Sequence, residues 1–331
     1  MKKKNTYLLV IFLLLIVTML VLLSRRSKQL ETETPQETEK NSIRATPLPN
    51  TSQENPIIST RLKSPPINKE MPQYKIEWGS ISKQMELLKT FFNIQAEPKK
   101  TNFDNRSGFI SSDVNGEIYI ENSPRYFYFN NNDSSNYQGP GLEKLEAEGK
   151  AKDLVKQFGV LPNKIEHKII KTQYLDLTGG EVRFVSKRES ATHTRVSIVY
   201  YINNFPLILS TQIQYSLSIT LNSNGSIKSM SGYFIDNIAE DKNLSILNTN
   251  EASIKLTSNQ GQLIRADVID SNYGLSEINF NKASINQSSL GYTLNESNGL
   301  LSPIYIFEGT APQNVKPFST YSITYIVSAI K

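Results

Sequence analysis

The residues best suited to acid–base chemistry in this chain are its two histidines, His167 and His193. His167 lies between charged neighbours in a strand-like run, which favours a solvated strand face. His193 lies in the stretch SKRESATHTR, which we interpret as a loop between two strands. The polar residue types of that stretch also suit an anion site or a Ser–His pair, and they are Lys187, Arg188, Ser190, Thr192 and Arg195.

A Ser-His-acid triad needs a third group that orients the base, and no G-x-S-x-G motif accompanies these serines. Paired carboxylates for glycoside hydrolysis need two acids across a cleft. Glu143, Glu146 and Glu148 fit the solvated face of a helix, and Asp236, Glu240 and Asp241 fit a loop. We therefore predict no catalytic residue and expect a binding or regulatory protein rather than an enzyme.

Metal and cofactor signatures are also lacking in the sequence. There is no cysteine and no H-E-x-x-H motif. DVNGE at 113–117 resembles part of a calcium loop but lacks its alternating oxygen ligands and distal glutamate, so we interpret it as a hairpin turn. NNNDSSN at 130–136 is a polar loop with oxygen donors. No glycine-rich loop suggests a bound nucleotide. We predict no metal site, no cofactor-binding residue and no cofactor.

The charge distribution argues against a nucleic-acid partner. The sequence pI is about 9.0, but the first 28 residues carry six Lys or Arg and no acid. The rest of the chain has 30 basic and 31 acidic residues. Its near-neutral charge provides no broad electrostatic footprint for a phosphate backbone.

The apolar run YLLVIFLLLIVTMLVLL, residues 7–23, predicts an uncleaved transmembrane signal anchor. At ~1.5 Å rise per residue the run spans roughly 25 Å, and SRRSK follows it in place of a small-residue cleavage site. Lysines precede the run and Arg25, Arg26 and Lys28 follow it, so the flanking charges discriminate little between orientations. We predict a single-pass cell-membrane protein with a cytoplasmic N-terminus and an extracytoplasmic bulk.

Five segments follow from composition and periodicity. Residues 1–28 form the cytoplasmic tip and signal anchor, and 29–73 form a disordered stalk rich in Pro, Ser and Thr. Three α+β modules are predicted at 74–140, 141–248 and 249–331, each beginning with a helical pattern and continuing as strands. The first pattern places Ile81, Met85, Leu88 and Phe92 on one stripe. The predicted fold class is α+β, with repeated units of a helix packed on a twisted antiparallel sheet.

Asparagine-rich dipeptides mark the predicted hairpins, because asparagine and glycine tolerate the positive φ that tight turns require. These dipeptides are Asn115-Gly116, Asn203-Asn204, Asn224-Gly225 and Asn298-Gly299. The last lies within LGYTLNESNGLLSPIYIFEG, residues 290–309, where aromatic residues suggest either a ligand groove or a hairpin. The alternation of Leu290, Tyr292 and Leu294 favours a hairpin in a sheet core.

The last module resembles the YycH/YycI regulatory-protein family, whose helix-plus-antiparallel-sheet units are PepSY-like. The residues that carry the resemblance are Leu290-Gly291-Tyr292, Pro303-Ile304-Tyr305 and the strand from Tyr325 to Ala329. It covers 249–331 best and 142–237 less well, and Tyr305 stands where the family often has Trp. The resemblance implies an N-terminally anchored bacterial envelope protein that acts without catalysis by contacting a membrane sensor kinase.

The sequence therefore predicts a membrane-anchored, non-catalytic protein that binds and modulates another envelope protein. Two alternatives stay open. One is a polysaccharide-binding surface protein whose tyrosines stack on sugars, and the other is a hydrolase with an unrecognised site. The oligomeric state does not follow from the sequence.

Overall fold

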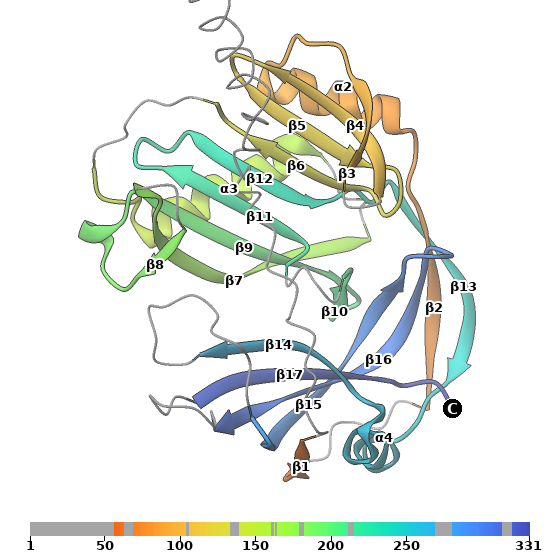
Figure 1. Ribbon diagram of the computed structural model, residues 1–331. Coiled ribbons are helices and arrows are strands. Elements are labelled where there is room, and N and C mark those ends of the chain that lie inside the picture. Colours follow the sequence, from red (N-terminus) through yellow and green to blue (C-terminus); the bar gives the residue numbers. More distant parts are fainter. Residues whose placement is uncertain are drawn as a thin grey trace, which may run out of the picture. The chain divides into compact units, whose positions relative to one another are not determined.

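The computed structural model describes residues 56–62, 69–103, 106–132, 139–159, 162, 164–178, 182–210, 215–268, 280–312 and 320–331. Within these ranges the regular structure consists of three α-helices and seventeen strands (Figure 1). The helices are α2 (Ile81–Phe92), α3 (Lys144–Phe158) and α4 (Thr249–Lys255). The strands are β1 (Ile57–Thr60), β2 (Glu70–Glu77), β3 (Lys99–Phe103), β4 (Arg106–Asp113), β5 (Gly116–Glu121), β6 (Tyr126–Asn130), β7 (Ile165–Asp176), β8 (Arg183–Val185), β9 (His193–Ile202), β10 (Phe205–Ile208), β11 (Leu217–Asn222), β12 (Ile227–Tyr233), β13 (Asn237–Ser245), β14 (Gln262–Val268), β15 (Lys282–Asn295), β16 (Leu300–Pro312) and β17 (Thr320–Ser328).

Each helix has a recognisable local cause. In α2, the predicted stripe buries Met85, Leu88 and Phe92, and Asn93 ends the helix in the left-handed conformation with a φ of 54°. Gly159 ends α3 in the same way. A capping box begins α4, because the side chain of Asn248 accepts from the backbone of Glu251 and the Glu251 carboxylate accepts from the backbone of Asn248.

The first half-sheet is antiparallel and has the strand order β3-β4-β5-β6-β12-β11-β9-β7-β8. Helix α2 packs against β5, and α3 packs against β9 and β7 (Figure 1). Phenylalanines fill the space between helices and strands. Phe92 stacks on Phe129 with ring centroids 3.6 Å apart, and Phe127 lies 5.3 Å from Phe158 and 4.8 Å from Phe234.

The second half-sheet contains β1, β2 and β13 to β17. Its central hairpin, β15–β16, confirms the hairpin predicted at 290–309, with Asn295 opposite Leu300 and Gly299 at a φ of 71°. The prediction that this segment lies in a core is confirmed too, because Tyr292, Tyr305 and Phe307 are all buried. Strand β10 joins the two half-sheets, since it runs antiparallel to β9 and parallel to β15.

The predicted fold class was wrong. The described chain is mainly β, and its pairings connect all seventeen strands into one mixed sheet rather than into repeated helix-on-sheet, PepSY-like units. The physical reason is that many strands pair with partners far along the chain. Strand β12 pairs with β6, β2 pairs with β13 and β16, and β1 runs parallel to β15. Strand β1 and the start of β2 lie within the segment predicted as a stalk.

The prediction of a single-pass membrane protein with a signal anchor and an extracytoplasmic bulk is also corrected. Across the described ranges, no helix combines the length and the apolar character that crossing a bilayer requires. The longest of these helices, α3, has 15 residues and carries many charged side chains, whereas a span needs about 20 apolar residues. The apolar run at 7–23 lies outside the described residues.

Candidate functional site

His193 opens strand β9 rather than lying in a loop, and its side chain is only 8% exposed. Its Nδ1 lies 2.7 Å from the Thr192 hydroxyl. Burial and the positive charge of Lys228 together lower the pKa of His193 to about 4, against the smaller opposing effects of a hydrogen bond with Asn222 and the charge of Asp176. His193 is therefore neutral near pH 7. The hydroxyl that contacts Nδ1 is thus that of a threonine, not that of a serine.

The remaining residues of the predicted 187–195 cluster are dispersed. Arg188 donates to the carbonyl of Gly141 at 2.8 Å and forms an ion pair with Glu143, while Arg195 is buried in β9. His167 lies in β7, where burial lowers its pKa and the lysines Lys152 and Lys156 lower it further. The stretch therefore does not assemble a catalytic group.

The acidic motifs likewise serve the fold. In DVNGE, the Asp113 carboxylate accepts from the backbone N–H groups of Gln95, at 2.6 Å, and Asn115, at 2.8 Å. These bonds lower the pKa of Asp113, that from Gln95 most strongly. The predicted hairpin is confirmed, because β4 and β5 pair around this turn. In the part of the chain that the structure describes, no group of three or more acidic or histidine side chains could hold a metal ion. Residues 133–136 of NNNDSSN lie outside that part.

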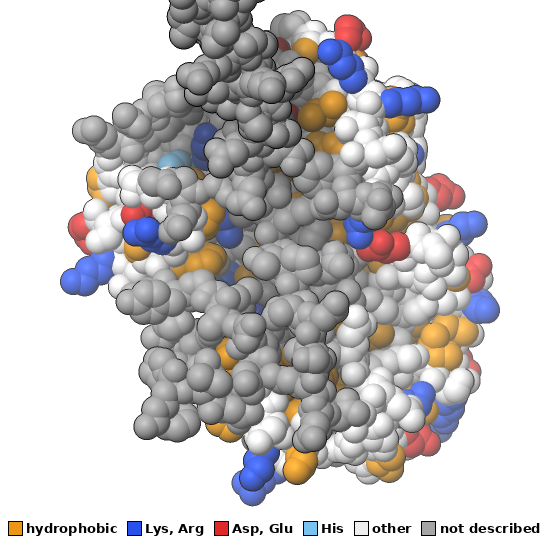
Figure 2. Space-filling view, in the orientation of Figure 1, with side chains coloured by type: hydrophobic (Ala, Val, Ile, Leu, Met, Phe, Trp, Pro, Cys, Tyr) orange, Lys and Arg blue, Asp and Glu red, His pale blue; other side chains and the backbone are white. Residues whose placement is uncertain are grey.

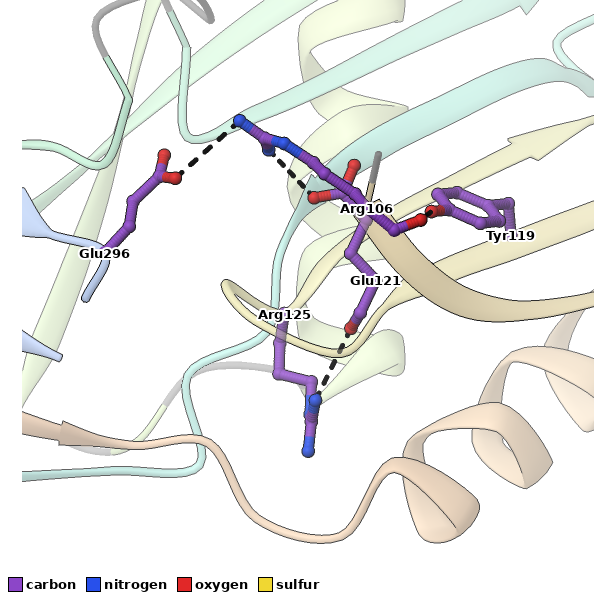
Figure 3. Close-up of polar contacts among 5 residues, drawn as sticks. All are labelled: Arg106, Tyr119, Glu121, Arg125 and Glu296. Carbon is purple, nitrogen blue, oxygen red and sulfur yellow. Dashed lines mark hydrogen bonds and ion pairs between the residues drawn. The ribbon is translucent and has the colours of Figure 1, made fainter. Parts of the chain in front are cut away.

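An ion-pair network that sequence reasoning missed lies around Arg106 (Figure 3). The Arg106 guanidinium contacts Glu121 at 2.9 Å and Glu296 at 3.6 Å. Burial lowers the pKa of Arg106, but the hydrogen bond and charge of Glu121 outweigh it and raise the pKa overall. Glu121 also accepts through its backbone carbonyl from Arg125. The register of the β4–β5 hairpin places Glu121 opposite Gly108, two residues from Arg106 on the same strand face, so hairpin register was the signal that could have found the pair.

This network joins the two half-sheets rather than forming an open site. Glu121 ends β5 and its side chain is 1% exposed, whereas Glu296 lies in the β15–β16 turn and is 39% exposed. One arginine thus contacts a buried carboxylate of its own half-sheet and a more exposed carboxylate of the other. On the face shown in Figure 2, acidic and basic side chains are interspersed.

A pocket of about 470 Å³ opens where α2 ends, and we call it the α2 pocket. It gathers the ends of four elements: α2, the β4–β5 turn, β6 and the start of β12. Its lining residues are Phe91, Phe92, Asn93, Val114, Asn115, Phe129, Asn131 and Ile227. The aromatic rings form an apolar floor, and three asparagines supply amide groups around it.

Hydrogen bonds hold the mouth of the α2 pocket in place. The Asn115 side chain donates to the Asn93 carbonyl at 2.7 Å, which ties the turn to the helix end. The Asn132 side chain donates to the Asp113 carbonyl at 2.8 Å. Val114, between these bonds, is 88% exposed. The chain therefore presents an exposed apolar side chain, on a turn held by hydrogen bonds, beside the aromatic residues that line the pocket.

Comparison with known proteins identifies no family for this chain. No family model and no curated protein matches the chain. An uncharacterised protein from Eubacterium rectale is similar with a TM-score of 0.48 and 12% identity, over 83% of this chain and 88% of that one. MucB matches with a TM-score of 0.12 and 7% identity, over 76% and 93%. The MucA/MucB complex of Pseudomonas aeruginosa matches with a TM-score of 0.12 and 8% identity, over 74% and 93%. These similarities support no functional inference, and the resemblance to YycH/YycI stays a prediction.

Proposed function

We propose that this chain is a non-catalytic protein that binds and modulates another protein, and that the α2 pocket receives an apolar side chain of that partner. The observation that carries the proposal is the placement of Val114, 88% exposed, at the mouth of a pocket with Phe91, Phe92 and Phe129 in its lining. Interface hot spots are typically apolar or aromatic anchors that fill such pockets.

The partner that this pocket favours presents an aromatic or branched aliphatic residue on an extended segment. The rings of Phe92 and Phe129 give it an apolar surface, and the amides of Asn93 and Asn115 can meet the backbone of such a segment. Because hydrogen bonds already hold the rim of the pocket, binding a partner would cost little free energy for ordering these residues.

Three tyrosines of the aromatic strands do not support the polysaccharide alternative. Tyr126, Tyr292 and Tyr305 are at most 4% exposed, so these tyrosines are not available to stack on sugars. Tyr128 is also largely enclosed, and burial raises its pKa above the usual range.

The test compares Val114→Asp with Leu145→Asp in the full chain. Leu145 lies on α3 and is 82% exposed, so both variants place the same charge on a comparably exposed aliphatic residue. A photoreactive amino acid at position 114 or 145 first identifies the partner in the native cell, and calorimetry with the purified partner follows. We expect capture from position 114 and at least tenfold weaker binding by Val114→Asp, about 1.4 kcal/mol.

Leu145→Asp should bind the partner as the unchanged chain does. Equal capture from both positions, or unchanged affinity of Val114→Asp, would contradict the assignment of the α2 pocket. If neither position captures a protein, the proposal of a protein-binding function fails as a whole.

A further inference from the structure

Arg195 on β9 is a buried cation, and among the described residues two of its three guanidinium nitrogens lack a hydrogen-bond partner. Its side chain is 9% exposed, and these two nitrogens are Nε and Nη2. The guanidinium lies over the ring of Phe184, with 5.7 Å from Cζ to the centroid. Buried arginines are normally paired, because removing a charge from water costs several kcal/mol. An orphaned guanidinium in this position indicates a missing anionic partner.

The surroundings of Arg195 add further positive charge. On the neighbouring strand β7, Lys171 pairs with Ser197 of β9. Because Ser197 is two residues from Arg195, the side chains of Lys171 and Arg195 lie on the same face of the sheet. Burial lowers the pKa of Lys171, Asp267 raises it, and the charges of Arg265 and Arg195 lower it. The Lys171 ammonium lies 4.0 Å from the Asp267 carboxylate, to which Arg265 also donates. Three cations thus lie in this part of the sheet, and Asp267 and Glu308 are the carboxylates that act on Arg265, which leaves a formal excess of one positive charge.

Neutral donors complete this cluster. Ser197 Oγ is buried beside the Tyr215 hydroxyl. Burial raises the pKa of the Tyr215 hydroxyl and outweighs the charges of Arg265 and Arg195, which lower it. Tyr215 therefore keeps its proton at neutral pH. An arginine fork, an ammonium and hydroxyl groups are the donors that proteins use for oxyanions.

We propose that Arg195, Lys171 and Arg265 form a binding site for a phosphate or phosphomonoester dianion. The planar guanidinium matches the spacing of tetrahedral oxygens. A phosphoryl group carries about −1.5 to −2 charge and three acceptor oxygens, so it can accept from Nε and Nη2 of Arg195 and from Lys171 at once, whereas a carboxylate has only two oxygens. The side chains of Lys171 and Asp267 are 36% and 26% exposed, so the ligand has an open side from which to enter. The site shares no residue with the α2 pocket and does not depend on the function proposed for it.

The experiment measures binding of inorganic phosphate to the full chain by calorimetry, and thermal unfolding at constant ionic strength. We expect phosphate to raise Tm relative to chloride, and sodium acetate to raise it less. Glycerol phosphate distinguishes a monoester site from a free-phosphate site: tighter binding than phosphate assigns the monoester, and weaker binding assigns free phosphate. Either result supports the proposal, and absence of binding by both overturns it.

Arg195→Met should bind phosphate at least tenfold more weakly. Without phosphate its Tm should equal or exceed that of the unchanged chain, because the substitution removes an uncompensated buried charge. A merely structural arginine would give the opposite result, a lower Tm without phosphate. Lys83→Gln, which removes one charge from the exposed side of α2, is the control and should change neither quantity.

Lys171→Gln changes a more exposed side chain and keeps the test decisive if Arg195→Met does not fold. We expect at least threefold weaker phosphate binding. A phosphate affinity that is unchanged in Lys171→Gln, or a Tm increase that chloride reproduces, would overturn the proposed site.

Discussion

Replacing Glu121 by glutamine removes one of the two carboxylates that contact Arg106 and keeps the shape of the side chain. Glu121 is 1% exposed and lies 2.9 Å from the guanidinium, whereas Glu296 is 39% exposed and lies 3.6 Å from it. Breaking a buried ion pair costs about 3–5 kcal/mol, and an exposed pair contributes about 0–1 kcal/mol. Because glutamine still accepts a hydrogen bond, we expect Glu121→Gln to lower the free energy of unfolding by about 3 kcal/mol, and Glu296→Gln by less than about 1 kcal/mol.

Urea unfolding followed by circular dichroism measures both values, and Glu296→Gln is the matched control because it removes the same charge from the same arginine. A double-mutant cycle of Glu121→Gln with Arg106→Met isolates the pairwise term. We expect a coupling energy well above that of the cycle with Glu296→Gln. Equal destabilisation by the two Glu→Gln variants would refute the reasoning that burial decides the strength of each contact.

Two further predictions concern single buried groups. The pKa of His193 is about 4 in the fold and about 6.5 when unfolded, so the unfolded state takes up a proton first as the pH falls. The stability that this residue contributes is complete above pH 6.5 and is lost as the pH falls from 6.5 to 4. We expect His193→Asn to flatten the dependence of Tm on pH across that window. An unchanged dependence would contradict the lowered pKa. The Tyr305 hydroxyl donates to the Leu247 carbonyl at 2.9 Å in a buried site. Tyr305→Phe should therefore lower the free energy of unfolding, measured in urea, by about 1–3 kcal/mol. Tyr201→Phe, at a less enclosed tyrosine, is the comparison and should lower it by less.

Local structure was largely predictable from the sequence. The stripe of Met85, Leu88 and Phe92 predicted α2, and the asparagine-containing turns predicted hairpins that the structure contains. Asn203 and Asn204 have φ values of 49° and 68°, as a tight hairpin turn requires. Not every apolar residue of a helix follows such a stripe, since Leu145 in α3 is 82% exposed.

The candidate sites were less accessible to sequence reasoning. The α2 pocket depends on four element ends whose lining residues run from Phe91 to Ile227 and meet only in the fold. Arg195 was noticed within SKRESATHTR, but its neighbours in that stretch are not its neighbours in space. The cations that surround it, Lys171 and Arg265, come from β7 and β14.

The sequence by itself determined the helix positions, the turns and the near-neutral charge beyond the first 28 residues, because these depend on neighbouring side chains and backbone preferences. Only the tertiary structure decided that the described strands form one mixed sheet, that Glu121 contacts Arg106, and that Arg195 is buried with two nitrogens unpaired among the described residues. The physical reason is that strand pairing is set by contacts between distant segments, and burial changes the energy of a charge far more than the identity of its sequence neighbours does.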